Sequence, residues 1–160
     1  MQEHRIEITY RQHDNFSTLD AKDRELVRCA QDSQKYSYAP YSRFHVGAAV
    51  RLENGEMVGN GNQENVSYPL CLCAERSVLA TVAARNAAQS IQAIAVTANA
   101  TNIIVAPCGA CRQVMFETEA RQGKPIKVFL QGPDSQWLEF SSVNDLLPFP
   151  FGPDSLLNRT

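Results

Sequence analysis

The fold of this chain is decided by residues 71–112, CLCAERSVLATVAARNAAQSIQAIAVTANATNIIVAPCGACR. A cysteine cluster lies at each end of this stretch. Between the clusters, Val78, Leu79 and Val82 recur at helical spacing, and residues 91–97 form an apolar run typical of a buried strand. The stretch therefore predicts a helix followed by a buried strand, with a cysteine cluster at each end.

Upstream of this stretch, the pattern predicts one helix and one β-hairpin. The helix begins at Thr18 or Asp20, each a plausible N-cap, and stops before Tyr38-Ala-Pro40. The hairpin covers residues 46–60, in which apolar alternation is interrupted by the turn dipeptide Asn54-Gly55.

Downstream, the chain returns to alternating elements. The pattern after Cys108 predicts a third helix, which Gly123-Lys-Pro125 ends. Two strands follow, at residues 126–130 and 137–140. A hairpin combined with later alternation of strands and helices predicts an α/β fold with a sheet of about five strands covered by helices.

The two ends of the chain differ in character. Residues 1–17 are polar and aperiodic, so we expect an N-terminal extension that is either loose or laid across a neighbouring molecule. Residues 146–160 begin with Leu-Leu-Pro-Phe-Pro-Phe-Gly-Pro, which is too stiff and apolar for an ordinary disordered end. The length of 160 residues suits a single domain, residues 1–160.

Charge and hydropathy exclude several classes of partner. With 15 basic and 17 acidic residues, a net charge of -2 and no basic cluster, the chain lacks the electrostatic pattern for polymeric nucleic acid. No apolar stretch approaches the roughly 20 residues of a membrane span, and the polar start is unlike a signal peptide. We therefore expect a cytoplasmic protein with no membrane partner. In that setting, five cysteines are reduced ligands or core residues rather than disulfides.

The spacing of the clustered cysteines favours a divalent metal. Cys108 and Cys111 lie one helical turn apart, so both sulfur atoms can face one tetrahedral Zn²⁺. The third thiolate must come from the other cluster, and spacing alone leaves Cys71 and Cys73 open. We favour Cys73, because it lies at the expected helix start, and helix N-termini lower the pKa of thiols.

A zinc ion with three protein ligands keeps a fourth position for water and lowers the pKa of that water to about 7. Glu75, two residues after Cys73, can then carry protons without binding the metal. Three thiolates around Zn²⁺ leave a net negative charge that a nearby cation must offset. Arg76 and Arg112 directly follow the ligand motifs, and of the two we favour Arg76.

A different class of function is a closed structural site. If all four clustered cysteines bind zinc, the protein is an interaction module, and Glu75 has no role. Zinc content after replacement of Cys71 separates the two readings. Cys29, near the apolar stripe of the first helix, is expected to be a core residue.

Several motifs in a fixed order carry a resemblance to a known family. They are Tyr41-Ser-Arg-Phe44-His-Val-Gly-Ala-Ala49, Gly61-Asn62-Gln-Glu64-Asn65, Ser67-Tyr68-Pro69, Cys73-Ala-Glu-Arg76, Pro107-Cys-Gly-Ala-Cys-Arg-Gln113 and Leu146-Leu-Pro148. With these motifs the chain resembles the small homotetrameric zinc-dependent cytidine deaminases from about residue 18 onward. The resemblance implies a three-layer α/β/α fold with a mixed sheet.

The same resemblance assigns roles to individual residues. Cys73, Cys108 and Cys111 match the ligands of one Zn²⁺ per subunit, and Glu75 matches the catalytic acid and base. Asn62 and Glu64 match residues that bind the ribose hydroxyls. The resemblance places in the nucleoside site Phe44, Asn62, Glu64, Tyr68, Ala74 and Phe151. It further implies a homotetramer with composite sites, in which the tail at residues 146–160 carries Phe151 into a neighbouring subunit.

The implied reaction is hydrolytic deamination of cytidine and 2′-deoxycytidine to uridine and 2′-deoxyuridine, with attack at C4 and release of ammonia, in pyrimidine salvage. A rival keeps the fold but takes a nucleotide, a nucleoside analogue or another base. Glu64 argues against a phosphate at the ribose, because its negative charge would repel one. We therefore expect a free nucleoside as substrate.

Overall fold

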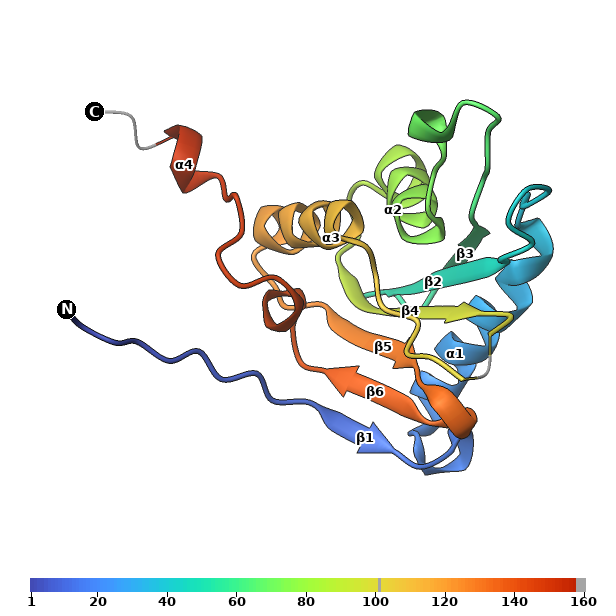
Figure 1. The fold of residues 1–160 in the computed structure, drawn as a ribbon, viewed down its shortest axis with the longest axis horizontal. Helices are drawn as coiled ribbons and strands as arrows, with labels where there is room; N and C mark the ends of the chain where they lie inside the picture. The colour runs from blue at the N-terminus through green and yellow to red at the C-terminus, as the bar shows by residue number, and fades with distance from the viewer. Residues whose placement is uncertain (101, 158–160) are drawn as a thin grey trace.

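The structure is a computed structural model that describes residues 1–100 and 102–157. Its centre is a mixed sheet of six strands in the order β1-β6-β5-β4-β2-β3 (Figure 1). The strands are β1 (Arg11–His13), β2 (Val46–Leu52), β3 (Met57–Gly61), β4 (Ile91–Ala98), β5 (Lys127–Gln131) and β6 (Trp137–Phe140). The pair β4 and β5 is parallel, and the other neighbours in the sheet are antiparallel.

Helices cover both faces of this sheet, as the three-layer expectation requires. Helix α1 (Ala21–Ser33) packs on one face, and α2 (Ala74–Arg85) and α3 (Gly109–Gln122) lie together on the other (Figure 1). A short helix, α4 (Asp154–Leu157), lies in the C-terminal tail. The 3-10 helices are η1 (Phe16–Thr18), η2 (Gln34–Tyr36), η3 (Tyr68–Leu70), η4 (Pro133–Ser135) and η5 (Val143–Leu146).

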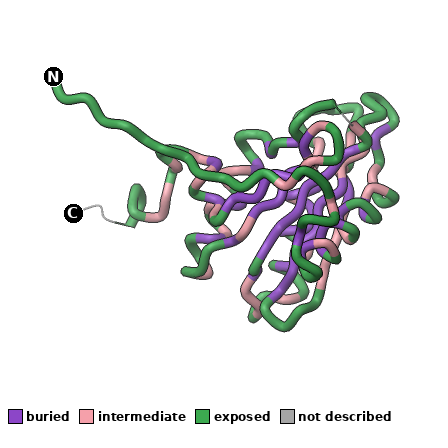
Figure 2. The backbone as a smooth tube through the Cα atoms, turned by 90° about the horizontal axis from the view of Figure 1, so that it is seen from below, coloured by how far each residue is buried: buried purple, intermediate pink, exposed green. Residues whose placement is uncertain are grey.

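Strand β4 shows why its sequence is apolar without alternation. Ile94 and Val96 belong to the core under α2 and α3, whereas Ala93 and Ala95 belong to the core under α1. Side chains that alternate along the strand are thus buried on both faces. Figure 2 shows this buried centre and the exposed ends of the chain.

The ends of the predicted helices agree with their local signals. Asp20 is the N-cap of α1, and the helix passes at Gln34 into η2 before the predicted stop. Gly123, with a φ of 64°, caps the end of α3 in the left-handed conformation that glycine adopts easily.

The expectation of about five strands is corrected to six. The additional strand is β1, which lies inside the stretch at residues 1–17 that we expected to be an irregular extension. It pairs with β6, and its His13 contacts Glu139 of β6 at 2.8 Å, with Arg11 at 3.5 Å from the same carboxylate. A three-residue polar strand has no hydrophobic period, so its position depends on a partner far along the chain.

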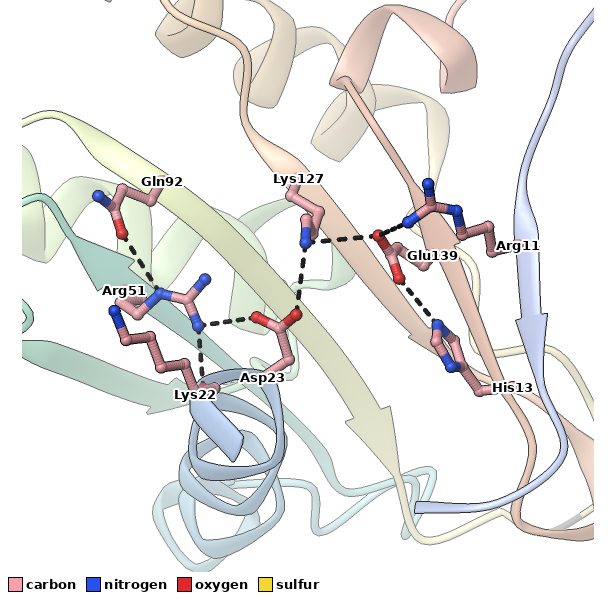
Figure 3. Close-up of polar contacts among 8 residues, drawn as sticks. All are labelled: Arg11, His13, Lys22, Asp23, Arg51, Gln92, Lys127 and Glu139. Atoms are coloured by element: carbon pink, nitrogen blue, oxygen red, sulfur yellow. Dashed lines mark hydrogen bonds and ion pairs between the residues drawn. The ribbon is translucent and has the colours of Figure 1, made fainter. Parts of the chain in front are cut away.

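A chain of ion pairs runs across the α1 face of the sheet (Figure 3). Lys127 of β5 lies 3.4 Å from Glu139 and 3.3 Å from Asp23 of α1. Asp23 in turn accepts a hydrogen bond of 2.8 Å from Arg51 of β2. These pairs connect α1 to β2, β5 and, through Glu139, to β1.

Both ends of the described chain are exposed. The first residues of the chain extend away from the sheet, and the tail with α4 leaves the body on the same side (Figures 1 and 2). Residues 158–160 of the expected tail lie outside the described residues. None of the described helices combines the length and hydropathy that a bilayer span requires.

Candidate active site

The site begins where two cysteines cap two neighbouring helices. Cys73 is the N-cap of α2, and Cys108 is the N-cap of α3, where its sulfur accepts from the main-chain N–H of Cys111 at 3.4 Å. Unpaired N–H groups and the positive dipole end of α2 favour a thiolate at Cys73. Both helix starts are reached through loops, one containing η3 with Pro69 and the other ending at Pro107.

Three sulfur atoms meet at these helix starts. The Sγ atoms of Cys73, Cys108 and Cys111 lie within 4.8 Å of one another. Cys73 and Cys108 are separated by 4.0 Å, and Cys108 and Cys111 by 3.4 Å. Tetrahedral zinc with Zn–S bonds of about 2.3 Å requires sulfur separations of about 3.8 Å. The observed separations bracket this value, so the three residues fit a zinc ion.

Cys71 lies outside this group. Its sulfur contacts the main chain of Asn65, accepting from the N–H at 3.2 Å and facing the carbonyl at 3.6 Å. Of the two cysteines that the spacing left open, Cys73 is therefore the one that lies with Cys108 and Cys111. The described residues do not form a closed four-cysteine site.

The thiol groups of Cys73 and Cys111 have pKa values shifted in opposite directions. A hydrogen bond from Cys111, with further support from Arg76, lowers the pKa of Cys73 to about 5. The hydrogen bond to Cys73, followed by burial, raises the pKa of Cys111. One thiolate and one thiol therefore share a proton, and a divalent cation replaces such protons when it binds.

Glu75 lies beside the sulfur atoms in the first turn of α2. Its side chain is buried, with 4% of the residue exposed, and burial raises the pKa of its carboxyl group. The charge of Cys73 acts in the same direction, whereas a hydrogen bond from Cys111 opposes it. A buried carboxyl group with a raised pKa suits general acid and base catalysis, because it takes up a proton more readily than an exposed one.

Of the two arginines, Arg76 faces the sulfur atoms. Its Nη2 donates to the carbonyl of Cys71 at 3.0 Å and lies 3.8 Å from the sulfur of Cys73. Its Nε is buried without a hydrogen-bond partner in the described part of the chain. Arg112 instead donates to the carbonyl of Pro107 at 2.8 Å. The positive charge expected near the thiolates is that of Arg76.

Asn62 and Glu64 both face one loop. Asn62 Oδ1 accepts from the Val46 N–H at 2.9 Å, and its Nδ2 donates to the Phe44 carbonyl at 2.9 Å. Glu64 accepts from the Tyr41 N–H at 2.9 Å and from the main chain and hydroxyl of Ser42. The Ser42 hydroxyl, as the largest cause, lowers the pKa of Glu64.

A short backbone pairing brings these residues to the metal group. Gln63 and Leu72 exchange two main-chain hydrogen bonds of 2.8 Å in an antiparallel bridge. The neighbours of this bridge place Asn62 opposite Cys73. The predicted ribose-binding residues and the predicted metal ligands therefore line one region.

The remaining residues predicted to bind the nucleoside differ in their exposure and in their contacts. Phe44 is partly exposed on the loop, and the Tyr68 ring meets the Tyr41 ring edge-on at 6.2 Å. Ala74 is fully buried at the start of α2. Phe151 is 60% exposed, and its carbonyl accepts from Gln113 Nε2 at 2.8 Å. The structure thus leaves the Phe151 ring largely exposed to solvent.

Sequence reasoning missed Ser42 and Asn99, which hold the loop that carries Phe44. Ser42 stands in a motif from which only Phe44 was assigned a role. Asn99 directly follows a buried strand, a position where a side-chain amide often bonds to nearby main chain. The sequence therefore indicates that the Asn99 side chain bonds to main chain, but it does not identify the residue that it bonds to.

Comparison with known proteins decides the family. Residues 20–124, which include all three cysteines of the group, match the family model for the zinc-binding region of cytidine and deoxycytidylate deaminases. The chain belongs to this deaminase family. The matched model is that of a zinc-binding region, and Cys73, Cys108 and Cys111 form a group able to hold such an ion.

Similar deaminases are known from several organisms. The cytidine deaminase of Halalkalibacterium halodurans is 40% identical over 79% of this chain and 91% of its own length. The probable cytidine deaminase of Dictyostelium discoideum is 36% identical over 84% of this chain and 89% of its own length.

Solved structures of deaminases share the fold. The cytidine deaminase of Burkholderia pseudomallei gives a TM-score of 0.66 at 41% identity and covers 79% of this chain and 97% of its own. That of Mycobacterium tuberculosis gives 0.65 at 32% identity and covers 83% of this chain and 99% of its own.

Proposed function

We propose that this protein deaminates cytidine and 2′-deoxycytidine by hydrolysis, giving uridine and 2′-deoxyuridine with ammonia, in pyrimidine salvage. The observation that carries the proposal is the group of three sulfur atoms with the buried Glu75 beside it. Three protein ligands leave a tetrahedral metal one open position, as hydrolytic zinc sites require. The identity of 40% to a named cytidine deaminase over most of the chain supports the substrate.

Groups in this region can carry out each step of the reaction. When bound, the zinc ion activates a water molecule for attack at neutral pH. Glu75 accepts a proton from the water that adds to C4 and delivers it to ring N3. As the new C4 hydroxyl becomes the carbonyl of uridine, Glu75 takes its proton and passes it to the amino group, so that the C4–N bond breaks and ammonia leaves. Arg76 offsets the negative charge of the thiolates through its donation toward Cys73.

The ribose is assigned to Asn62 and Glu64. Asn62 Nδ2 donates one of its two N–H groups to Phe44, which leaves the other for a hydroxyl oxygen. The Glu64 carboxylate accepts hydrogen bonds from sugar hydroxyls and repels a phosphate. These two side chains favour the free nucleoside over the monophosphate.

The assembly belongs to the same proposal. We infer a single-domain subunit in a homotetramer, with the tail from residue 146 carrying Phe151 into a neighbouring site. The exposed ring of Phe151 and the exposed Tyr68 support such a composite site. A cytoplasmic location suits the reduced cysteines, since all five, each within the described residues, are free of disulfide bonds.

The test compares the wild-type protein with Glu75→Gln in an ultraviolet assay on cytidine, deoxycytidine, cytosine and cytidine monophosphate, with zinc measured in both. We expect turnover of the two nucleosides by the wild type. We expect Glu75→Gln to keep its zinc and its melting temperature. Its kcat should fall about 10²–10⁴-fold.

Activity of Glu75→Gln within tenfold of the wild type would contradict the role of Glu75. Absence of cytidine turnover by zinc-loaded wild type would contradict the reaction itself. Equal rates on cytidine and its monophosphate would contradict the role given to Glu64.

A further inference from the structure

The loop at residues 41–45, here called the Phe44 loop, carries an aromatic side chain that the proposed function places against the nucleoside. It contains no helix or strand, and Arg43 adopts a φ of 57°. A residue other than glycine enters this left-handed region only against a steric cost. The conformation of the loop therefore depends on the groups that hold it.

Asn99 holds this loop from the end of β4. Its Oδ1 accepts from the His45 N–H at 3.0 Å, and its Nδ2 donates to the Arg43 carbonyl at 3.0 Å. Its own N–H also donates to the His45 carbonyl at 3.0 Å. The asparagine thus fixes the main chain immediately before and immediately after Phe44.

Other groups complete the restraint on Phe44. The Phe44 N–H donates to the Ser42 hydroxyl at 3.0 Å, and its carbonyl accepts from Asn62 at 2.9 Å. Asn62 is one of the predicted ribose-binding residues. Asn99 therefore acts on the same short segment as the nucleoside site, but from the first residue after a buried strand of the sheet.

We propose that Asn99 is a positioning residue for nucleoside binding, which sets the direction of Phe44 by clamping both of its neighbours. This inference rests on the proposed function. The clamp requires an amide, because one side chain must accept from an N–H and donate to a carbonyl at the same time. An aspartate can only accept when ionised, so it keeps the bond to His45 and repels the carbonyl of Arg43.

The test uses Asn99→Ala and Asn99→Asp, with Asn102→Ala as the matched control from the same loop, where the side chain is exposed. We expect both Asn99 variants to raise KM for cytidine about tenfold while kcat changes less than about threefold, since a binding interaction is lost and the zinc and Glu75 are untouched. Zinc content stays at the wild-type level, and Asn102→Ala behaves as the wild type.

Two further measurements separate positioning from a general loss of structure. Hydrogen exchange should quicken at His45 in Asn99→Ala, while the amides of β4 keep their protection. In the Phe44→Ala background, Asn99→Ala should raise KM by less than about twofold, because the residue through which it acts is gone.

The outcomes distinguish this inference from the proposed function. A wild type that turns over cytidine, together with an unchanged KM in Asn99→Ala, would overturn the positioning role alone. Additive effects of Asn99→Ala and Phe44→Ala would also overturn it. A zinc-loaded wild type without cytidine turnover would overturn both.

Discussion

At the scale of single residues, a shift of two positions decides whether a cysteine can hold the metal. Cys73 caps α2 and reaches the other sulfur atoms, whereas Cys71 turns its sulfur to the main chain of Asn65. Both are cysteines in one cluster, so composition alone does not separate them. Their place in the chain separates them, since Cys73 stands at the start of α2 with its sulfur 4.0 Å from that of Cys108, whereas Cys71 lies two residues earlier.

The difference between these cysteines is testable by metal analysis. We expect Cys71→Ser to keep about one zinc per chain and Cys73→Ser to lose most of its zinc during dialysis against a weak chelator. Removal of one of three protein ligands lowers metal affinity much more than removal of a residue that only bonds to backbone. Loss of zinc from Cys71→Ser would revive the closed four-cysteine site.

At the scale of elements, the α1 face is joined by buried charges rather than by apolar packing alone. Asp23 and Arg51 form a pair whose side chains are 6% and 11% exposed, and Lys127 extends the pair to Glu139. Such a pair adds little stability compared with apolar residues of similar size. Loss of one partner is costly, because the other charge stays buried without compensation.

Asp23→Asn should therefore destabilise the fold. We expect a decrease of about 3 kcal/mol in the free energy of unfolding, measured by urea denaturation at fixed protein and zinc concentration. The control is Glu53→Gln, which removes an exposed pair with Lys124 at 2.9 Å and should leave stability nearly unchanged. Equal effects of the two substitutions would show that burial of the α1-face pair is energetically irrelevant.

At the scale of the whole molecule, the two ends of the chain leave the body on the same side with apolar side chains exposed. Phe149, Phe151 and Leu157 are exposed in the tail, and Ile6 and Ile8 are exposed in the N-terminal segment. Exposed apolar groups that gather on one side mark an interaction surface. This arrangement supports the proposed assembly, in which Phe151 completes the site of another subunit.

A mixing experiment tests the composite site. Glu75→Ala and Phe151→Ala should each have low activity alone, and co-expression of the two chains should restore a measurable fraction of the wild-type rate. Mixed assemblies contain sites that combine an intact Glu75 from one chain with an intact Phe151 from another. Activity no higher than the average of the two variants would show that Phe151 acts within its own subunit.

The sequence alone determined the features that depend on nearby residues. Sequence patterns predicted the starts of α2 and α3, the central strand, the hairpin and the spacing of Cys108 and Cys111. They could do so because capping, hydrophobic period and turn chemistry act over a few positions. The metal group follows from these local features once both helices begin side by side.

The tertiary structure alone decided the contacts between distant segments. The polar strand β1 joins the sheet through Glu139, which lies 126 positions after His13, and Asn99 clamps a loop at His45, 54 positions earlier. No local pattern encodes such pairs, because they depend on the order and register of strands that the global packing selects. The neighbours of such a polar residue in the sequence do not identify its partner, because the two meet only after the chain between them has folded.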